Sequence, residues 1–103
     1  MSVNLILADD NTATRSALAF ILSRRLGLRL AGEAASAKEL TDLLRASTVQ
    51  GGVLVLDWDL PGLSADRDLS ALRALNPRMK IIVLSARGDV RDLALAAGAD
   101  AFV

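Results

Sequence analysis

Residues 53–62 read VLVLDWDLPG, four apolar residues that run directly into an acidic residue. A short unbroken apolar run bounded by turn residues is typical of a strand buried on both faces of a sheet. Pro61 and Gly62 mark the turn that follows it. Asp57 is therefore predicted at the carboxyl end of a buried strand, which is the edge where open α/β sheets bind their ligands.

Apolar runs and helical spacing elsewhere in the chain predict four more strands with helices between them. The expected strands are residues 3–8, 28–32, 53–56, 81–84 and 101–103. Helices are expected at residues 12–25, 64–75 and 90–97. A further helix is expected to begin at the capping box of Ser36 and to fade at residues 47–48. Strands that alternate with helices imply a parallel sheet with right-handed crossovers and helices on both faces. We expect one α/β domain, residues 1–103.

The composition excludes several classes of function. Lys+Arg and Asp+Glu number 12 each, so no global basic field is available to bind nucleic acid. The chain has no Cys and no His, which excludes disulfides, thiolate or His-ligated zinc, and acid–base catalysis by His. No signal peptide and no apolar run of about 20 residues is evident, so we expect a cytoplasmic protein without a membrane span.

Three carboxylates are predicted to share one edge of the sheet. Asp9 and Asp10 follow the first strand, and Asp57 follows the third. Carboxylates packed together repel one another unless a cation compensates them, and Mg²⁺ prefers such oxygen ligands. The alternative is that these are ordinary loop residues and helix N-caps. The metal site is favoured, because the pair Asp9-Asp10 and the third residue Asp57 follow two adjacent strands.

With these features, the chain resembles the receiver domain of a two-component response regulator over residues 3–103. The matching motifs are Asp9-Asp10, Asp57 with Pro61-Gly62 four residues later, Ser85 at the end of the fourth strand, and Gly98-Ala99-Asp100 before the fifth. Segments 5–10 and 30–34 are most similar to the subgroup that carries a helix-turn-helix output domain. The resemblance implies a CheY-like, flavodoxin-like doubly wound sheet of five parallel strands in the order 2-1-3-4-5.

The resemblance also implies a role for each matching residue. Asp57 would be the phosphoacceptor for a sensor histidine kinase, and Asp10, Asp57 and the backbone carbonyl of Asp59 would hold Mg²⁺, with Asp9 completing the pocket through water. Ser85 would donate its hydroxyl to the phosphoryl group, and Phe102 would be the aromatic residue that follows its movement. Ser85 alone could equally be a hydroxyl that caps the next turn, and Phe102 alone could be a core residue.

The sequence departs from the family pattern at its carboxyl end. It stops before the lysine that usually follows the aromatic residue of the fifth strand and before the last helix, so we expect a truncated receiver. Lys80 enters the fourth strand from the opposite end and cannot replace that lysine, whereas Arg87 is either a nearby cation or a solvated surface residue. The sheet face left bare by the absent helix predicts a homodimer.

Two other functions stay open at this point. A pseudo-receiver would use the same fold as a docking or dimerisation module without phosphorylation. A haloacid-dehalogenase-like phosphatase would use Asp57 as nucleophile and Asp59 as general acid, although that family places its DxD motif after the first strand. The favoured interpretation is a non-enzymatic phosphoacceptor that switches a downstream output, expected to be transcription, without binding DNA itself.

Overall fold

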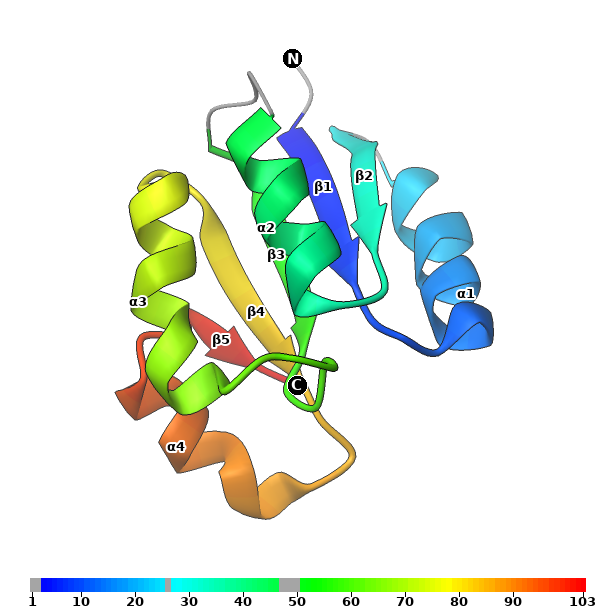
Figure 1. The fold of residues 1–103 in the computed structure, drawn as a ribbon. Helices are drawn as coiled ribbons and strands as arrows, with labels where there is room; N and C mark the ends of the chain where they lie inside the picture. Colours follow the sequence, from blue (N-terminus) through cyan, green and yellow to red (C-terminus); the bar gives the residue numbers. More distant parts are fainter. Residues whose placement is uncertain (1–2, 26, 47–50) are drawn as a thin grey trace.

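The strands of the sheet are short and mostly apolar, as expected for a sheet covered on both faces. The computed structural model describes residues 3–25, 27–46 and 51–103, except for the side chains of residues 65 and 66. The sheet consists of five strands, β1 (Val3–Ala8), β2 (Leu28–Ala34), β3 (Val53–Asp57), β4 (Lys80–Leu84) and β5 (Ala101–Phe102). All neighbouring pairs are parallel, and the strand order is β2-β1-β3-β4-β5. The predicted flavodoxin-like topology is therefore confirmed (Figure 1).

In the described part of the chain, four α-helices connect these strands. They are α1 (Thr12–Ser23), α2 (Ala37–Ala46), α3 (Ala65–Leu75) and α4 (Arg91–Ala96), and a 3₁₀ turn, η1 (Gly88–Val90), precedes α4. The last helix is thus shorter than the predicted 90–97, because its first turn is wound as 3₁₀. The expected end of the second helix at 47–48 lies outside the described residues.

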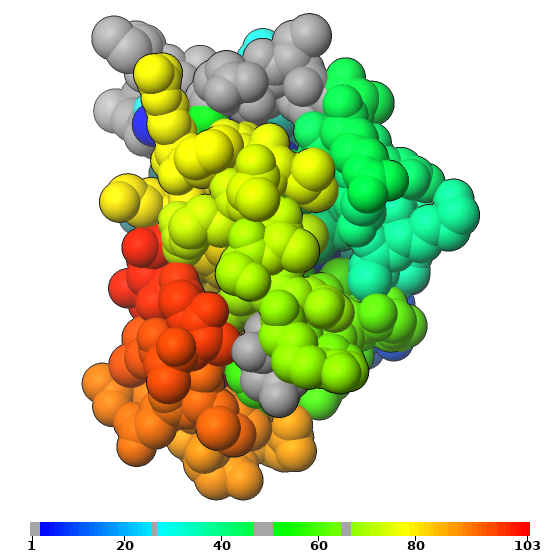
Figure 2. Space-filling view, turned by 60° about the vertical axis from the view of Figure 1, so that its left-hand side comes forward, coloured from blue at the N-terminus to red at the C-terminus, as the bar shows by residue number. Residues whose placement is uncertain are grey.

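Two apolar clusters fill the space on the two faces of the sheet. The larger cluster joins β1, β3 and β4 to α2, α3 and α4 through residues that include Leu40, Leu72 and Ala94. The smaller cluster, Leu5, Leu7 and Val55, packs with side chains of α1 on the other face. Helices α2 and α3 lie side by side in Figure 1, and Figure 2 shows α3 on the surface between α2 and α4.

Helix α1 is rotated relative to the stripe that its sequence predicts. The i, i+1, i+4, i+5 spacing predicts a buried stripe of Ala17, Leu18, Ile21 and Leu22. However, Ala17 is exposed and Ile21 is 53% exposed. Instead, Leu18, Ala19 and Leu22 pack against the smaller cluster. At about 100° per residue, Leu18, Leu22 and Ala19 span an arc of about 100° on the helix, and Ile21 lies about 60° beyond Leu18 on the other side. A helix that contacts only one patch of the sheet therefore leaves Ile21 outside the contact.

Side-chain caps fix where α1 and α2 begin. The side chain of Asn11 accepts the N–H of Thr14, which starts α1 immediately after the acidic pair. The Ser36 hydroxyl accepts the N–H of Glu39 at 3.2 Å, as the capping box predicts. The Glu39 carboxylate reaches back to the N–H of Ala35 at 3.0 Å, one residue before the expected partner.

Candidate metal centre

Three carboxylates meet at the carboxyl edge of the sheet. Strands β1 and β3 are neighbours with Ala8 paired to Leu56, so the next residues, Asp9 and Asp57, emerge side by side. Each of Asp9, Asp10 and Asp57 offers a carboxylate oxygen, and these oxygens all lie within 4.8 Å of one another. Asp9 is buried, Asp57 is half-buried and Asp10 is exposed. The topology thus produces the carboxylate cluster that the sequence predicts.

Backbone amides orient two of these carboxylates. The Oδ1 atom of Asp9 accepts the N–H of Asn11 at 2.8 Å. The Oδ1 atom of Asp57 accepts the N–H of Asp59 at 3.0 Å. In the described part of the chain, the Oδ2 atom of Asp57 has no hydrogen-bond partner. One oxygen of Asp57 is therefore fixed while the other remains available to a metal or a substrate.

The surroundings of Asp57 disfavour its charged form. Burial is the main cause that raises the pKa of Asp57, and repulsion from Asp9, Asp59 and Asp10 raises it further. The hydrogen bond from the Asp59 amide acts in the opposite direction. A divalent cation placed among these oxygens would offset both burial and repulsion. The donor set, all hard oxygen atoms, fits Mg²⁺.

Ser85 lies beside the carboxylates, at the end of β4. A hollow of about 390 Å³ is lined by Asp9, Thr14, Asp57, Leu84, Ser85, Ala86 and Val103. The Ser85 Oγ accepts the N–H of Arg87 at 3.0 Å, so this hydroxyl does cap the following turn. Because a hydroxyl accepts and donates independently, its proton is still free to point into the hollow.

Phe102 and Asp59 are placed differently from the carboxylates. Phe102 is half-buried on β5 and packs against the larger apolar cluster, and it does not line the hollow. The Asp59 side chain points to Arg87, with 3.2 Å between its Oδ1 and the arginine Nη2. The roles of the Asp59 carbonyl as a ligand and of the Phe102 ring as a switch stay predictions.

Arg15 is a neighbour of the site that the sequence reasoning missed. Its Nη1 donates to the backbone carbonyl of Asp9 at 2.6 Å, and its Nε lies 3.0 Å from the Glu33 carboxylate. The guanidinium therefore joins the acidic loop to the end of β2. Helical periodicity places Arg15 on the outer side of its helix. Periodicity distinguishes core from surface residues, but it does not show which polar groups a surface side chain contacts. The feature of the sequence that indicates this contact is the position of Arg15 in the first helical turn after the acidic pair.

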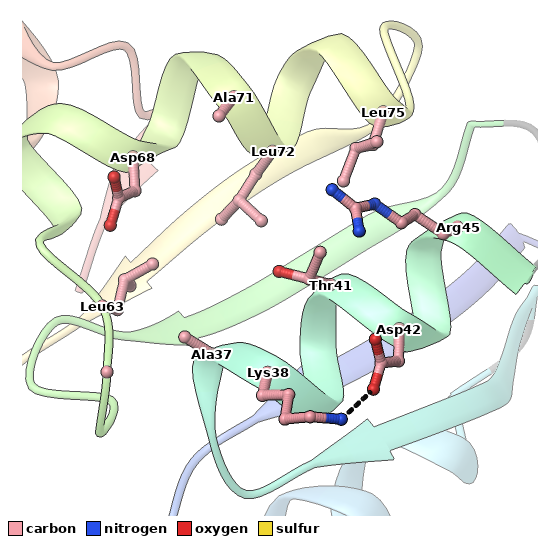
Figure 3. A pocket seen from close by; sticks show the side chains of 11 residues that line it. Ala37, Lys38, Thr41, Asp42, Arg45, Leu63, Asp68, Ala71, Leu72 and Leu75 are labelled. Atoms are coloured by element: carbon pink, nitrogen blue, oxygen red, sulfur yellow. Dashed lines mark hydrogen bonds and ion pairs between the residues drawn. The ribbon is translucent and has the colours of Figure 1, made fainter.

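A larger groove lies between α2 and α3, about 540 Å³ in volume (Figure 3). Leu63, Leu72 and Leu75 provide its apolar lining. Its Lys38 and Asp42 neutralise each other at 2.8 Å. None of the three clustered carboxylates lines this groove, whereas Asp9 and Asp57 line the smaller hollow.

This carboxylate cluster and this fold occur together with a match to a known protein family. The family model of the response regulator receiver domain matches residues 5–103. The chain belongs to the response-regulator receiver family. Domains of this family generally act as signalling modules and not as enzymes. Among the described residues, none of the helices combines the length and hydrophobicity needed to cross a bilayer.

Relatives of this receiver domain include transcriptional regulators. The chain is 34% identical over 106 residues to the transcriptional regulatory protein PrrA of Mycobacterium tuberculosis, covering 99% of this chain and 43% of that protein. The chain thus spans less than half the length of that relative.

Solved structures give the same assignment. A LuxR-family response regulator from an Aurantimonas species matches with a TM-score of 0.84 and 25% identity, over 99% of this chain and 73% of that one. A response regulator from Burkholderia pseudomallei, solved with a phosphorylated aspartic acid and a calcium ion, matches with a TM-score of 0.78 and 27% identity. That match covers 98% of this chain and 58% of the other.

Proposed function

We propose that this receiver domain accepts a phosphoryl group on Asp57 from a sensor histidine kinase, in a Mg²⁺-dependent reaction. The observation that carries the proposal is the position of Asp57 within 4.8 Å of two further carboxylates, with one oxygen held by the Asp59 amide. A solved relative with a phosphorylated aspartic acid supports the same chemistry.

The proposed reaction is a direct transfer to the carboxylate. The free Oδ2 of Asp57 attacks phosphorus and forms an O–P bond, while the P–N bond of the phosphohistidine breaks. The electron pair of that bond stays on the imidazole nitrogen of the kinase. With acetyl phosphate as donor, a P–O bond breaks instead and acetate leaves. The product in both cases is an acyl phosphate at Asp57.

Asp10, Asp57 and the backbone carbonyl of Asp59 would hold the Mg²⁺ ion, and Asp9 would act through water. When bound, the ion supplies positive charge that neutralises the transferring phosphoryl group. The Asp59 amide keeps the Asp57 carboxylate oriented throughout. Ser85 would then donate its free hydroxyl proton to a phosphoryl oxygen, because it lines the same hollow as Asp57.

The output proposed for this switch is transcription, through a partner domain and not through DNA contacts of this segment. PrrA, named as a transcriptional regulator, supports this proposal. Movement of Ser85 toward the phosphoryl group would be followed by Phe102, which pairs with Val83 across β4 and β5. The proposed kinase partner implies a cytoplasmic location. The homodimer also stays a prediction, which light scattering on the purified chain would check.

The phosphatase alternative is disfavoured by the environment of Asp59. A general acid must reach the leaving group, but the Asp59 carboxylate lies 3.2 Å from the Arg87 guanidinium and does not line the hollow that contains Asp57. The pseudo-receiver alternative differs only in lacking phosphorylation.

One experiment separates the three functions. The purified chain is incubated with acetyl phosphate, with Mg²⁺ or with EDTA, and its intact mass is measured. A stable gain of one phosphoryl group with Mg²⁺ supports the receiver, and no gain supports the pseudo-receiver. Multiple turnover of p-nitrophenyl phosphate would support the phosphatase instead.

A further inference from the structure

Arg87 connects the two loops that border the carboxylate cluster. Its Nη2 lies 3.2 Å from the Oδ1 of Asp59, in the loop after β3. Its backbone N–H donates to the Ser85 hydroxyl at 3.0 Å, in the loop after β4. One residue therefore contacts both the neighbour of the proposed phosphoacceptor and the proposed phosphoryl-binding hydroxyl.

The Arg87–Asp59 ion pair is suited to exchange. Both side chains are more than half exposed, at 53% and 64%. Exposed pairs of this kind contribute little to stability, so little free energy is lost when one is broken. A phosphoryl group carries more charge than a carboxylate and offers oxygens that match the two-pronged guanidinium. A phosphoryl group on Asp57, two residues from Asp59, would compete for the same cation.

Other cations near the site are less free to move. Arg15 is held by both the Asp9 carbonyl and Glu33, and its side chain is only 18% exposed. Arg91, on the following helix, pairs with its own sequence neighbour Asp92 at 3.4 Å. Arg87 is therefore the described cation whose partner is both adjacent to Asp57 and easily replaced.

We propose that Arg87 is a phosphoryl-contacting residue that is stored on the Asp59 carboxylate and transfers to the phosphoryl group on Asp57. The transfer would stabilise the acyl phosphate by charge-assisted hydrogen bonds and draw the loop of Ser85 toward the site. Asp59 then has two separable functions. Its backbone N–H orients the Asp57 carboxylate, and its side chain competes with the phosphoryl group for Arg87. This inference rests on the proposed function of Asp57.

A double-mutant cycle on the lifetime of the acyl phosphate tests the proposal. The chain is phosphorylated with acetyl phosphate and Mg²⁺, the donor is removed, and the phosphorylated fraction is followed by intact mass. We expect Arg87→Gln to shorten the half-life about threefold or more, a modest loss for a charge-assisted contact. Arg87→Lys should restore part of it, and Arg91→Gln, the matched control from an exposed ion pair nearby, should leave it unchanged.

The competing carboxylate gives the decisive comparison. Asp59→Asn should lengthen the half-life by releasing Arg87, and this gain should disappear in the double variant with Arg87→Gln. Equal half-lives for the wild type and Arg87→Gln, or an Asp59→Asn gain that persists without Arg87, would overturn the inference while phosphorylation of the wild type still supports the proposed function. A wild-type chain that never gains a phosphoryl group would overturn both.

Discussion

The backbone N–H of Asp59 donates to the Oδ1 of Asp57 at 3.0 Å, so the loop after β3 holds the carboxylate at the end of that strand. Strand β3 ends at Asp57, and a turn closes immediately because the N–H of Leu60 bonds to the Asp57 carbonyl. The orientation of the proposed nucleophile therefore follows from the backbone of a tight turn and needs no second side chain.

Removing the charge of Asp57 should stabilise the metal-free chain at neutral pH. Its pKa is raised in the folded state, chiefly by burial, so the folded chain keeps that proton longer than the unfolded chain. Stability is therefore lost as the pH rises from the ordinary pKa of Asp through the raised value. In EDTA, we expect Asp57→Asn to melt above the wild type at pH 7, with a gap that closes at acid pH. An equal or lower melting temperature at pH 7 would contradict this.

Mg²⁺ should raise the melting temperature of the wild type through the same cluster. A ligand present at ten times its Kd adds about 1.4 kcal/mol to the free energy of unfolding, which corresponds to about 6–11 °C for a domain of this size. Asp10→Asn should lose most of this shift in a thermal melt. Asp89→Asn, which removes an exposed carboxylate outside the cluster, is the control and should keep it. An equal shift in both variants would argue against the cluster as the metal site.

Asp100 should stabilise the fold far from the carboxylate cluster. Its Oδ2 accepts the N–H of Ile81 at 2.9 Å and lies 2.9 Å from the Nη2 of Arg73, and these contacts lower the pKa of Asp100. The stability that it contributes is present above the ordinary pKa of Asp and is lost as the pH falls through the lowered value. We expect Asp100→Asn to reduce the free energy of unfolding at pH 7 by about 1 kcal/mol, and not at low pH. Urea titrations at two pH values measure this, and a pH-independent loss would exclude the charge as its cause.

Gly52 should be intolerant of any side chain. Its φ is +95°, and a Cβ there would lie 2.5 Å from the backbone oxygen of Asn4 in β1. Gly52→Ala therefore combines left-handed strain with a backbone clash at the start of β3, and we expect a loss of more than about 2 kcal/mol. Gly27→Ala, with φ +85° and nothing within 4 Å of the added Cβ, should lose only the strain, about 1–2 kcal/mol. Urea titrations measure both losses in the free energy of unfolding. Equal losses for the two variants would contradict a cost of the clash at Gly52.

Much of this fold could be predicted from hydrophobic pattern alone. The apolar runs around Leu5 and Leu54 predict strands buried on both faces. In residues 28–30, Leu28 and Leu30 flank Arg29, and this alternation predicts a less buried strand, which the structure places at the edge of the sheet. The order of the strands came from the family resemblance, because pattern shows which segments are strands and not which of them are neighbours. The rotation of α1 was missed for a related reason. Periodicity identifies the apolar face of a helix, but it does not show how much of that face the sheet covers.

The candidate site was predicted in part. Asp9, Asp10 and Asp57 could be brought together because residues that follow neighbouring parallel strands must emerge at one edge. The partners of the Arg15 and Arg87 side chains could not be predicted, since a long side chain reaches several groups and only the folded loops decide which one it contacts. In the sequence, Arg87 could be a cation near the site or a solvated residue, and the structure pairs it with Asp59.

The most direct test of the central claim locates the phosphoryl group within the chain. After treatment with acetyl phosphate and Mg²⁺, borohydride reduction converts an aspartyl phosphate into homoserine, which peptide mass spectrometry assigns to a position. We predict homoserine at position 57 in the wild type and none in Asp57→Asn. Homoserine at Asp9, Asp10 or Asp59, or none in a chain that folds and binds Mg²⁺, would contradict the claim that Asp57 is the phosphoacceptor.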